Sequence, residues 1–123
     1  MQAIARGRSP CRLALLIATL AGAMTPAMAG AADAERGRRL AERYHCGTCH
    51  LIPDVPAARG RIAASLAGFG RRSYIAGRLP NEPQLLERWL MDPAALVPGT
   101  AMPAMGVSAA DARDLAAYLR SLQ

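Results

Sequence analysis

The sequence predicts an all-α domain with three main helices and long loops between them. Apolar residues recur at a spacing of three to four residues in three separate stretches, as on the buried face of a helix. No stretch alternates between apolar and polar residues as a β-strand would. Glycine and proline are concentrated between the helical stretches, and the length of 123 residues suits a single domain.

Residues 1–29 are expected to form a signal peptide that is cleaved after export. Arginines precede an apolar run at residues 13–23, and Ala-Met-Ala at residues 27–29 has the small residues that signal peptidase recognises. A retained membrane anchor is the alternative, but spanning a bilayer takes about 20 apolar residues. The cysteine of this segment, Cys11, has no predicted role. The folded domain is therefore expected to comprise residues 30–123 and to work in the periplasm.

The first helix is expected to run from about Ala34 to the first cysteine of the domain, Cys46. Asp33 can cap its amino end. Two prolines within residues 51–56 exclude regular structure soon after this helix. Small and apolar residues recur along the helix at helical spacing: Ala34, Gly37, Leu40, Ala41 and Tyr44.

Residues 57–83 are expected to form a loop with at most one or two helical turns, because they contain four glycines and two prolines. A structureless loop of this length is uncommon in a compact domain. Its length suggests that a group other than protein fills part of the interior.

The second helix is expected to begin at Pro83, since proline is tolerated in a first helical turn, and to end at residues 92–93. Residues 94–107 are expected to form another loop. The third helix is expected to begin at Ser108, with Asp111 completing a variant of the capping box. The apolar positions are Leu85, Leu86, Trp89 and Leu90 in the second helix, and Ala112, Leu115, Ala116, Leu119 and Leu122 in the third.

The charge of the domain is modest. Residues 30–123 contain 12 of the 15 basic residues and all nine acidic residues, which gives a formal charge of 12 − 9 = +3. No basic run is long enough to indicate nucleic-acid binding, so no nucleic-acid partner is expected.

Cys46, Cys49 and His50 form the sequence Cys-x-x-Cys-His, which is the attachment sequence of c-type haem. Two thiols separated by two residues can form thioether bonds with the two vinyl groups of one porphyrin. The histidine that follows is then carried to the iron, which an imidazole nitrogen can ligate. The sequence therefore predicts one haem c, bound covalently through both cysteines, with His50 as an iron ligand.

Other uses of paired cysteines fit the sequence less well. A thioredoxin-like pair follows a strand, whereas a helix is expected here. A zinc site needs four ligands in a tetrahedron, and the cysteines and histidines of the domain all lie within residues 45–50, too close for one ion. A disulfide would leave His50 without a role. His45 is expected to be a partly exposed histidine at the helix end, not a second iron ligand.

The domain resembles the class I cytochromes c along nearly its whole length. The resemblance implies the cytochrome c fold, in which the first and last helices cross at a small residue and an aromatic one, here Gly37 and Tyr118. Besides the Cys-x-x-Cys-His sequence, it rests on four segments in the family's order: residues 65–71, 87–93, 98–103 and 114–119.

The resemblance also implies roles for residues around the haem. Met102 corresponds to the methionine whose sulfur ligates iron opposite the histidine, and Arg71 to an arginine that binds a haem propionate. Trp89 corresponds to an aromatic residue that lines the haem pocket. Ala64 stands where the family usually has a proline, whose carbonyl oxygen accepts a hydrogen bond from the ligating histidine.

Met105 is the alternative to Met102 as the sulfur ligand. Met102 is favoured because it follows the Pro-Gly-Thr sequence at residues 98–100 and lies outside any helical stripe. Of the other residues near the site, Arg72 is expected to be solvated, and Tyr74 is a further candidate for contact with a propionate.

Histidine and methionine on opposite sides of the iron leave no position for oxygen or a substrate. The resemblance therefore implies an electron-transfer protein, not an enzyme, with redox proteins as partners: a haem-copper oxidase or other respiratory complex, and a donor cytochrome or dehydrogenase. Contact with the membrane would come only through such complexes. Two alternatives remain: a haem-bearing subunit of a larger oxidase or dehydrogenase, and a ligand-binding or sensing cytochrome in which Met102 is labile.

Overall fold

The computed structural model describes residues 30–123, and the expected signal peptide, with Cys11, lies outside the described residues. Four α-helices form most of the regular structure: α1 (Ala34–Arg43), α2 (Pro83–Met91), α3 (Pro93–Leu96) and α4 (Ala109–Ser121). Two short 3₁₀ turns, η1 (Cys46–Thr48) and η2 (Phe69–Arg71), lie between α1 and α2 in the sequence. The three longer helices are those that the sequence predicts, so the all-α class is confirmed.

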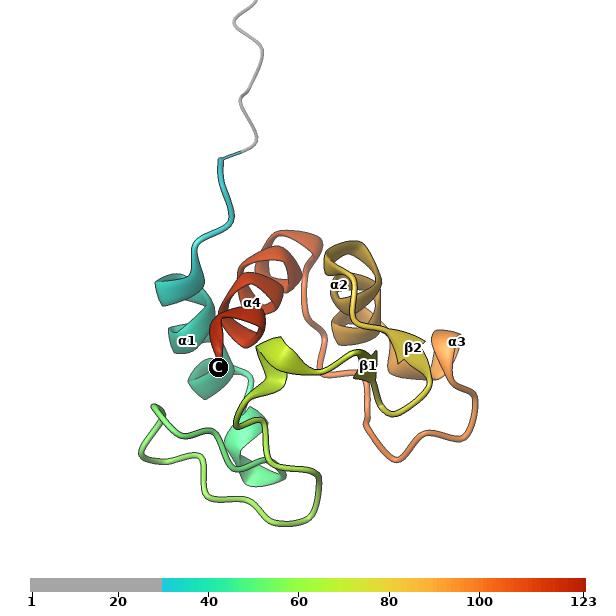
Figure 1. Cartoon of the computed structure of the whole chain (residues 1–123), viewed down its shortest axis with the longest axis horizontal. Helices are drawn as coiled ribbons and strands as arrows, with labels where there is room; N and C mark the ends of the chain where they lie inside the picture. Colours follow the sequence, from blue (N-terminus) through green and yellow to red (C-terminus); the bar gives the residue numbers. More distant parts are fainter. Residues whose placement is uncertain (1–29) are drawn as a thin grey trace, which may run out of the picture.

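Helix α4 is the centre of the helical packing. Helix α1 packs against it on one side and α2 on the other, and η2 also contacts it (Figure 1). The long segment between α1 and α2 leaves this helical layer and forms the loops below it in Figure 1. Within residues 30–123, no helix is both long and apolar enough to cross a bilayer.

Helix α1 begins where the sequence predicts but ends earlier. The Asp33 side chain accepts a hydrogen bond from the N–H of Arg36 and so caps the amino end. The helix ends at Arg43 because His45, two residues later, has a left-handed backbone conformation with φ of 55°. The chain then turns through η1, so the prediction of a helix that continues to Cys46 is wrong.

Helices α2 and α4 begin as predicted, after Glu82 and Ser108. The Ser108 hydroxyl accepts a hydrogen bond from the N–H of Asp111, as the capping sequence predicts. Residues 94–107 are not entirely loop, because Asp92 accepts a hydrogen bond from the N–H of Ala95 and starts the single turn of α3. Four residues are too few to show helical spacing in the sequence.

A small β-hairpin lies between η2 and α2, where the sequence predicts no strand. Strand β1 (Tyr74–Ile75) pairs antiparallel with β2 (Leu79–Pro80). Ala76 and Gly77 both have positive φ, as the tight turn between the strands requires. Strands of two residues are too short to show alternation in the sequence, so this hairpin could not be predicted, and it leaves the all-α class unchanged.

Helix α1 crosses α4 at Gly37, where the two backbones approach closely. A Cβ atom at Gly37 would lie 2.1 Å from the carbonyl oxygen of Asp114 and 2.7 Å from the Cβ atom of Tyr118. The structure therefore contains the crossing of a small residue and an aromatic one that the resemblance implies. Arg36 of α1 adds ion pairs with Asp111 and Asp114 of α4 beside this crossing.

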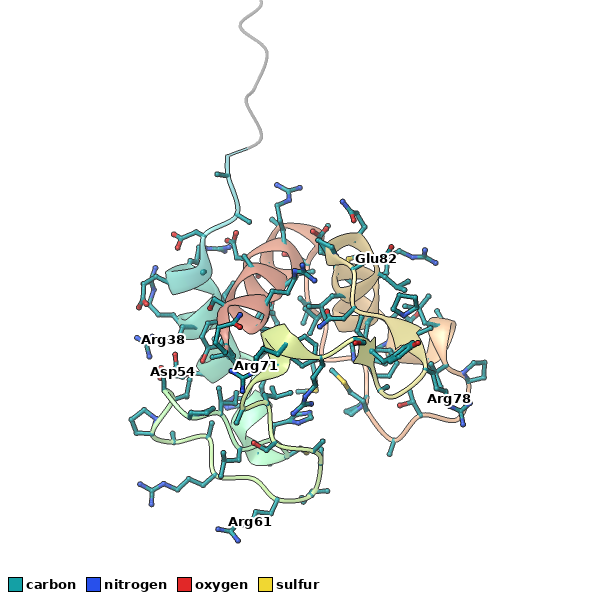
Figure 2. The ribbon with its side chains drawn as sticks, in the orientation of Figure 1. Arg38, Asp54, Arg61, Arg71, Arg78 and Glu82 are labelled. Carbon is teal, nitrogen blue, oxygen red and sulfur yellow. The ribbon has the colours of Figure 1, made fainter. Side chains whose placement is uncertain are left out.

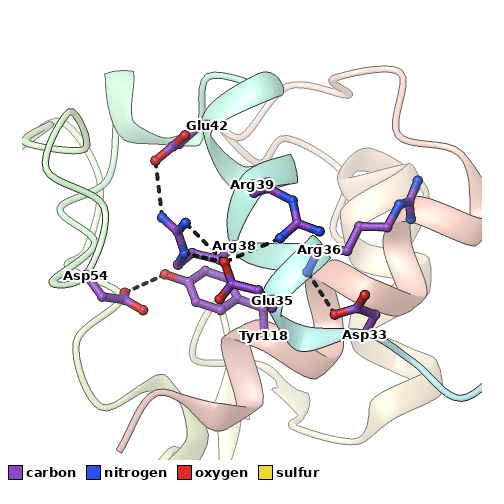
Figure 3. Close-up of polar contacts among 8 residues, drawn as sticks. All are labelled: Asp33, Glu35, Arg36, Arg38, Arg39, Glu42, Asp54 and Tyr118. Atoms are coloured by element: carbon purple, nitrogen blue, oxygen red, sulfur yellow. Dashed lines mark hydrogen bonds and ion pairs between the residues drawn. The ribbon is translucent and has the colours of Figure 1, made fainter.

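Tyr118 also ties the loop after η1 to α4. Its hydroxyl donates a hydrogen bond of 2.5 Å to the Asp54 carboxylate (Figure 3). Burial of the phenol, together with the neighbouring carboxylate, raises the pKa of Tyr118. The pairs that Arg38 makes with Glu35 and Glu42 on α1 are partly exposed, so they contribute little to stability (Figure 3).

Candidate functional site

The helices and loops enclose a cavity of about 800 Å³. Leucines of α2 and α4 form part of its wall, among them Leu86 and Leu115, which are each 1% exposed. Its volume lies within the range of roughly 300–1,000 Å³ that is typical of small-molecule and cofactor sites. The wall is mainly apolar, as the interior of a compact domain would be, and the cavity opens to solvent between loops.

The cavity brings together five of the six predicted site residues. Its lining includes Cys46, Cys49, His50, Trp89 and Met102. The first three come from η1 and the residues after it, Trp89 from α2, and Met102 from the loop between α3 and α4. Segments more than 50 residues apart in the sequence thus contribute to one site, as the resemblance implies.

His50 has one ring nitrogen engaged and one available. Its Nδ1 atom lies 2.6 Å from the carbonyl oxygen of Ala64. Because a carbonyl oxygen only accepts hydrogen bonds, Nδ1 carries the proton and Nε2 keeps its lone pair. The backbone N–H of His50 donates to the carbonyl oxygen of Cys46, which fixes the residue relative to η1. The structure therefore has the hydrogen bond to Ala64 that the resemblance implies, although Ala64 is not a proline.

Cys46 and Cys49 are both free thiols on the cavity wall. Burial raises the pKa of the Cys46 thiol, since the thiolate would lose its hydration. Catalytic thiols of the thioredoxin type have the opposite shift, towards a stable thiolate. The environment of this cysteine is therefore unlike that of a thiol-disulfide enzyme.

The segment after the cysteines folds back onto them. Gly60 donates its N–H to the carbonyl oxygen of Gly47, and Ala63 donates to that of Cys49. A Cβ atom at Gly60 would lie 2.4 Å from the carbonyl carbon of Cys49 and 2.5 Å from the carbonyl oxygen of Thr48. Only a residue without a side chain allows this approach. No sequence pattern marks Gly60 for it, because glycine is common throughout residues 57–83.

Met102 and Met105 have different environments. Met102 is half-buried and lines the cavity, and its N–H donates a hydrogen bond to the Thr100 hydroxyl. Met105 is 40% exposed and is absent from the cavity lining. Of the two methionines weighed as iron ligands, the structure brings only Met102 to the cavity wall.

The two adjacent arginines lie opposite to the expectation from the sequence. Arg71 is exposed and does not line the cavity, so its predicted contact with a haem propionate has no support in this geometry. Arg72, expected to be solvated, is half-buried on the cavity wall. It donates hydrogen bonds to backbone carbonyls and lies over the Phe69 ring, 5.6 Å from its centroid. The turn η2, which the sequence does not specify in detail, decides which of the two points inward.

The other residues considered from the sequence differ in their position relative to the cavity. Trp89 is 6% exposed and lies on the cavity wall, whereas Tyr74 is 57% exposed at the same cavity and is free to reach a group at its mouth. His45 is exposed and lines a separate small hollow. This position agrees with the expectation of an exposed histidine at the helix end.

The residues around the cavity fit a haem. The donor set combines an imidazole with one free nitrogen, a thioether and two thiols, all on the wall of one apolar cavity. Within residues 30–123, no group of three or more histidine, cysteine or acidic side chains could hold a metal ion by itself. The donors thus suit a metal whose other positions are filled by a porphyrin.

Comparisons with known proteins agree with this site. A profile of the family described as Cytochrome c matches residues 34–123. Cytochrome c-552 of Bradyrhizobium diazoefficiens is 33% identical over 104 residues, which cover 85% of this chain and 88% of that protein. A cytochrome c of Euglena viridis is 30% identical over 101 residues, which cover 74% of this chain and 98% of that protein.

A second kind of relative is much longer than this chain. Cytochrome c oxidase subunit 2 of Alkalihalophilus pseudofirmus is 40% identical over 91 residues, which cover 73% of this chain but 26% of the subunit. The chain therefore spans about a quarter of that subunit's length.

Proposed function

Because this chain belongs to the cytochrome c family, we propose that it is a one-electron carrier whose covalently bound haem is ligated by His50 and Met102. The observation that carries the proposal is that both side chains line the cavity that also holds the two cysteines. Iron held by an imidazole and a thioether can gain or lose one electron without a change of ligands, and the thioether raises its potential. The protein is then a carrier and not an enzyme.

The hydrogen bond between His50 and Ala64 supports this assignment. It places the proton on Nδ1 and leaves Nε2 to ligate the metal, and a partner of this kind makes an imidazole a stronger ligand. The apolar wall that α2 and α4 provide keeps water from the bound group. These residues therefore hold the iron in one coordination state while electrons are exchanged at the open side of the cavity.

The optical spectrum of the purified protein tests the proposal. The oxidised protein is expected to show the far-red absorption band of sulfur bound to iron, and the reduced protein is expected not to bind carbon monoxide at neutral pH. Ready binding of carbon monoxide without that band would instead favour the ligand-binding or sensing cytochrome. A protein without haem absorption would contradict both functions.

We propose that redox partners dock at the cavity mouth. Two loop segments supply most of this mouth, and their charges differ sharply from the rest of the domain. Residues 55–81 contain five arginines and no acidic residue, and residues 93–107 contain no charged residue. In Figure 2, Arg61 lies at the end of the loops and Arg78 beside the β-hairpin, both away from Glu82. A partner with an acidic surface around its own redox group complements this face.

Two exposed apolar side chains lie at the same mouth. Ile62 is 82% exposed and Tyr74 is 57% exposed, and both belong to the cavity lining. An apolar contact surrounded by cationic side chains suits a transient complex. The charges steer the encounter, and a small apolar contact that excludes water brings the redox groups together. A haem-copper oxidase or another respiratory complex is the proposed acceptor, and a cytochrome or dehydrogenase is the proposed donor.

The similarity to oxidase subunits favours one alternative, a haem-bearing part of a larger oxidase. The relative from Alkalihalophilus pseudofirmus is named as such a subunit, and this chain matches about a quarter of it. Purification from native membranes distinguishes the two arrangements, because a fixed subunit would remain with the oxidase in salt that releases a free carrier.

The export of the protein to the periplasm is also part of the proposal. It rests on the sequence of residues 1–29, with its arginines, short apolar run and Ala-Met-Ala. The mass of the protein isolated from its native source is expected to correspond to a chain that begins at Gly30. A full-length mass would support the retained anchor.

A further inference from the structure

The ligating histidine depends on a carbonyl oxygen in an exposed segment. Ala64, whose oxygen accepts the hydrogen bond of His50, is exposed, as are its neighbours Ser65 and Ala67. No residue of the described part of the chain accepts a hydrogen bond from the N–H of Ala64. On either side, Ala63 and Leu66 donate backbone hydrogen bonds to Cys49 and Leu51, and Leu66 is buried. The remaining freedom of the segment is therefore confined to Ala64 and Ser65, where a further contact can hold the Ala64 oxygen in place.

The side chain of Arg72 makes that contact. Its Nη2 atom donates to the carbonyl oxygen of Ser65 and to that of Ala67, the latter at 3.2 Å. The nitrogen has two protons, so it can serve both oxygens at once. The guanidinium also lies over the ring of Phe69, a contact that favours a planar cation. The Ser65 carbonyl directly follows Ala64 in the chain and the Ala67 carbonyl lies three residues after it, so Arg72 holds the segment next to the Ala64 oxygen.

Arg72 is itself anchored to helix α4. The Asn81 side chain donates to the carbonyl oxygens of Arg72 and Phe69, at 2.9 and 3.2 Å. Arg120 of α4 donates in turn to the carbonyl oxygen of Asn81 at 2.7 Å. The N–H of Gly70 donates to the carbonyl oxygen of Leu122, just after α4, at 2.7 Å. These hydrogen bonds hold the backbone of Arg72 in place relative to α4.

We infer that Arg72 is a positioning residue for His50, which acts by clamping residues 65–67 so that the Ala64 oxygen stays on Nδ1 of the imidazole. The inference rests on the proposed function in one respect, that His50 ligates the haem iron. A loose Ala64 oxygen would let the imidazole rotate and would weaken its donation to the metal. The clamp uses one nitrogen of the guanidinium, and its other N–H groups remain available at the cavity wall.

Hydrogen exchange in the haem-loaded protein tests the inference. In Arg72→Gln, the Nδ1 proton of His50 and the backbone N–H of Leu66 are expected to exchange with solvent about tenfold faster, because a hydrogen bond to a charged donor is lost. Amide protons inside α4 are expected to exchange at the wild-type rate. Arg71→Gln is the matched control, since this neighbour is exposed and lies outside the cavity, and it is expected to leave all these rates unchanged.

A second substitution separates the clamp from the charge of Arg72. Ala64→Pro fixes the backbone of the segment and keeps the carbonyl oxygen, and it removes no hydrogen bond of the described structure. In the double variant Arg72→Gln/Ala64→Pro, the exchange rate of the His50 proton is expected to return to near the wild-type value. If the effect of Arg72 came from its charge, proline would not restore the rate.

Three results would overturn the inference: an unchanged His50 exchange rate in Arg72→Gln, the same increase in Arg71→Gln, or an equal increase at every amide of the domain. Failure of the proposed function has a different signature. The wild-type protein would then lack haem absorption before any variant is compared.

Discussion

Met102 and Met105 are three residues apart, but only Met102 lines the haem cavity. Met102→Ala is expected to abolish the far-red band of the oxidised protein and to let the reduced protein bind carbon monoxide, because the iron loses one axial ligand. Met105→Ala is the matched control and is expected to leave the spectrum unchanged. The ligand assignment would be reversed if Met105→Ala alone removed the band.

Gly60 lies against the backbone of the attachment segment. Gly60→Ala is expected to lower the yield of haem-loaded protein severalfold, since the new Cβ atom would meet the backbone of Thr48 and Cys49 at about 2.5 Å. The measurement is haem absorbance per milligram of purified chain. Gly30→Ala is the control, because nothing lies within 4 Å of its Cβ position. An equal yield from both variants would show that the segment can move aside without cost.

At the residue scale, the sequence predicted the contiguous part of the site best. Cys46, Cys49 and His50 are adjacent in the chain, so their spacing alone carries the chemistry of haem attachment. The position of Arg72 on the cavity wall, in place of Arg71, could not be predicted, because η2 turns the second arginine inward and a 3₁₀ turn has no pattern that the sequence shows. The contact of Arg72 with two backbone carbonyls could not be predicted, since backbone groups are present at every position.

The crossing of α1 and α4 has no space for a side chain at Gly37. Gly37→Ala is expected to lower the free energy of unfolding by at least about 2 kcal/mol, because the helices must separate to admit the methyl group. Denaturant unfolding of the haem-loaded protein measures the change. Gly30→Ala again serves as the control, and its stability is expected to match the wild type.

Polar contacts between the same helices predict a loss of stability in acid. The hydroxyl of Tyr44 and the guanidinium of Arg36 lower the pKa of Asp111, and the N–H of Asp33 together with Arg36 lowers that of Asp114. A carboxyl group with a lowered pKa stabilises the folded state above its unfolded pKa, about 4. This contribution is lost as the pH falls through the lower, folded pKa.

Unfolding measured as a function of pH checks this expectation. The stability that these two groups provide should be constant at neutral pH and should fall below about pH 4. In Asp111→Asn/Asp114→Asn, the protein is expected to be less stable at neutral pH but to lose less stability on acidification. A double variant with the same acid profile as the wild type would assign the loss to other carboxylates.

At the scale of elements, the helices with caps could be predicted and the short elements could not. Asp33, Pro83 and Ser108 mark helix starts through local chemistry that the sequence displays. The early end of α1 and the turn of the β-hairpin depend on positive φ at His45 and Ala76, which are not residues that favour this conformation as glycine does. Contacts elsewhere in the fold impose these conformations.

For the molecule as a whole, the separation of charge predicts how it reacts with charged redox reagents. The rate of oxidation by ferricyanide, an anion, is expected to fall severalfold in Arg61→Gln/Arg78→Gln at low ionic strength and to differ little from the wild type in high salt. Arg113→Gln, an exposed arginine of α4, is the control for total charge. An equal effect of the control would show that the net charge, and not the face at the cavity mouth, steers the reagent.

The cavity also makes the fold dependent on its cofactor. Without a bound group, the apolar wall of this cavity of about 800 Å³ would lose its packing partners and face water. The net stability of a typical domain is only about 5–15 kcal/mol, so a loss of this kind can unfold it. Cys46→Ala/Cys49→Ala, which cannot form thioether bonds, is therefore expected to lose most of its helical circular dichroism when haem is removed. Retention of the wild-type spectrum would show that the helices form a sufficient core alone.

The close approach of Gly60 to the backbone of Thr48 and Cys49 has a consequence for biosynthesis. In the closed segment, Gly60 and Ala63 donate hydrogen bonds to the backbone of Gly47 and Cys49, so the attachment sequence can no longer change shape freely. Attachment of the cofactor is therefore expected to be fastest while the polypeptide is still open.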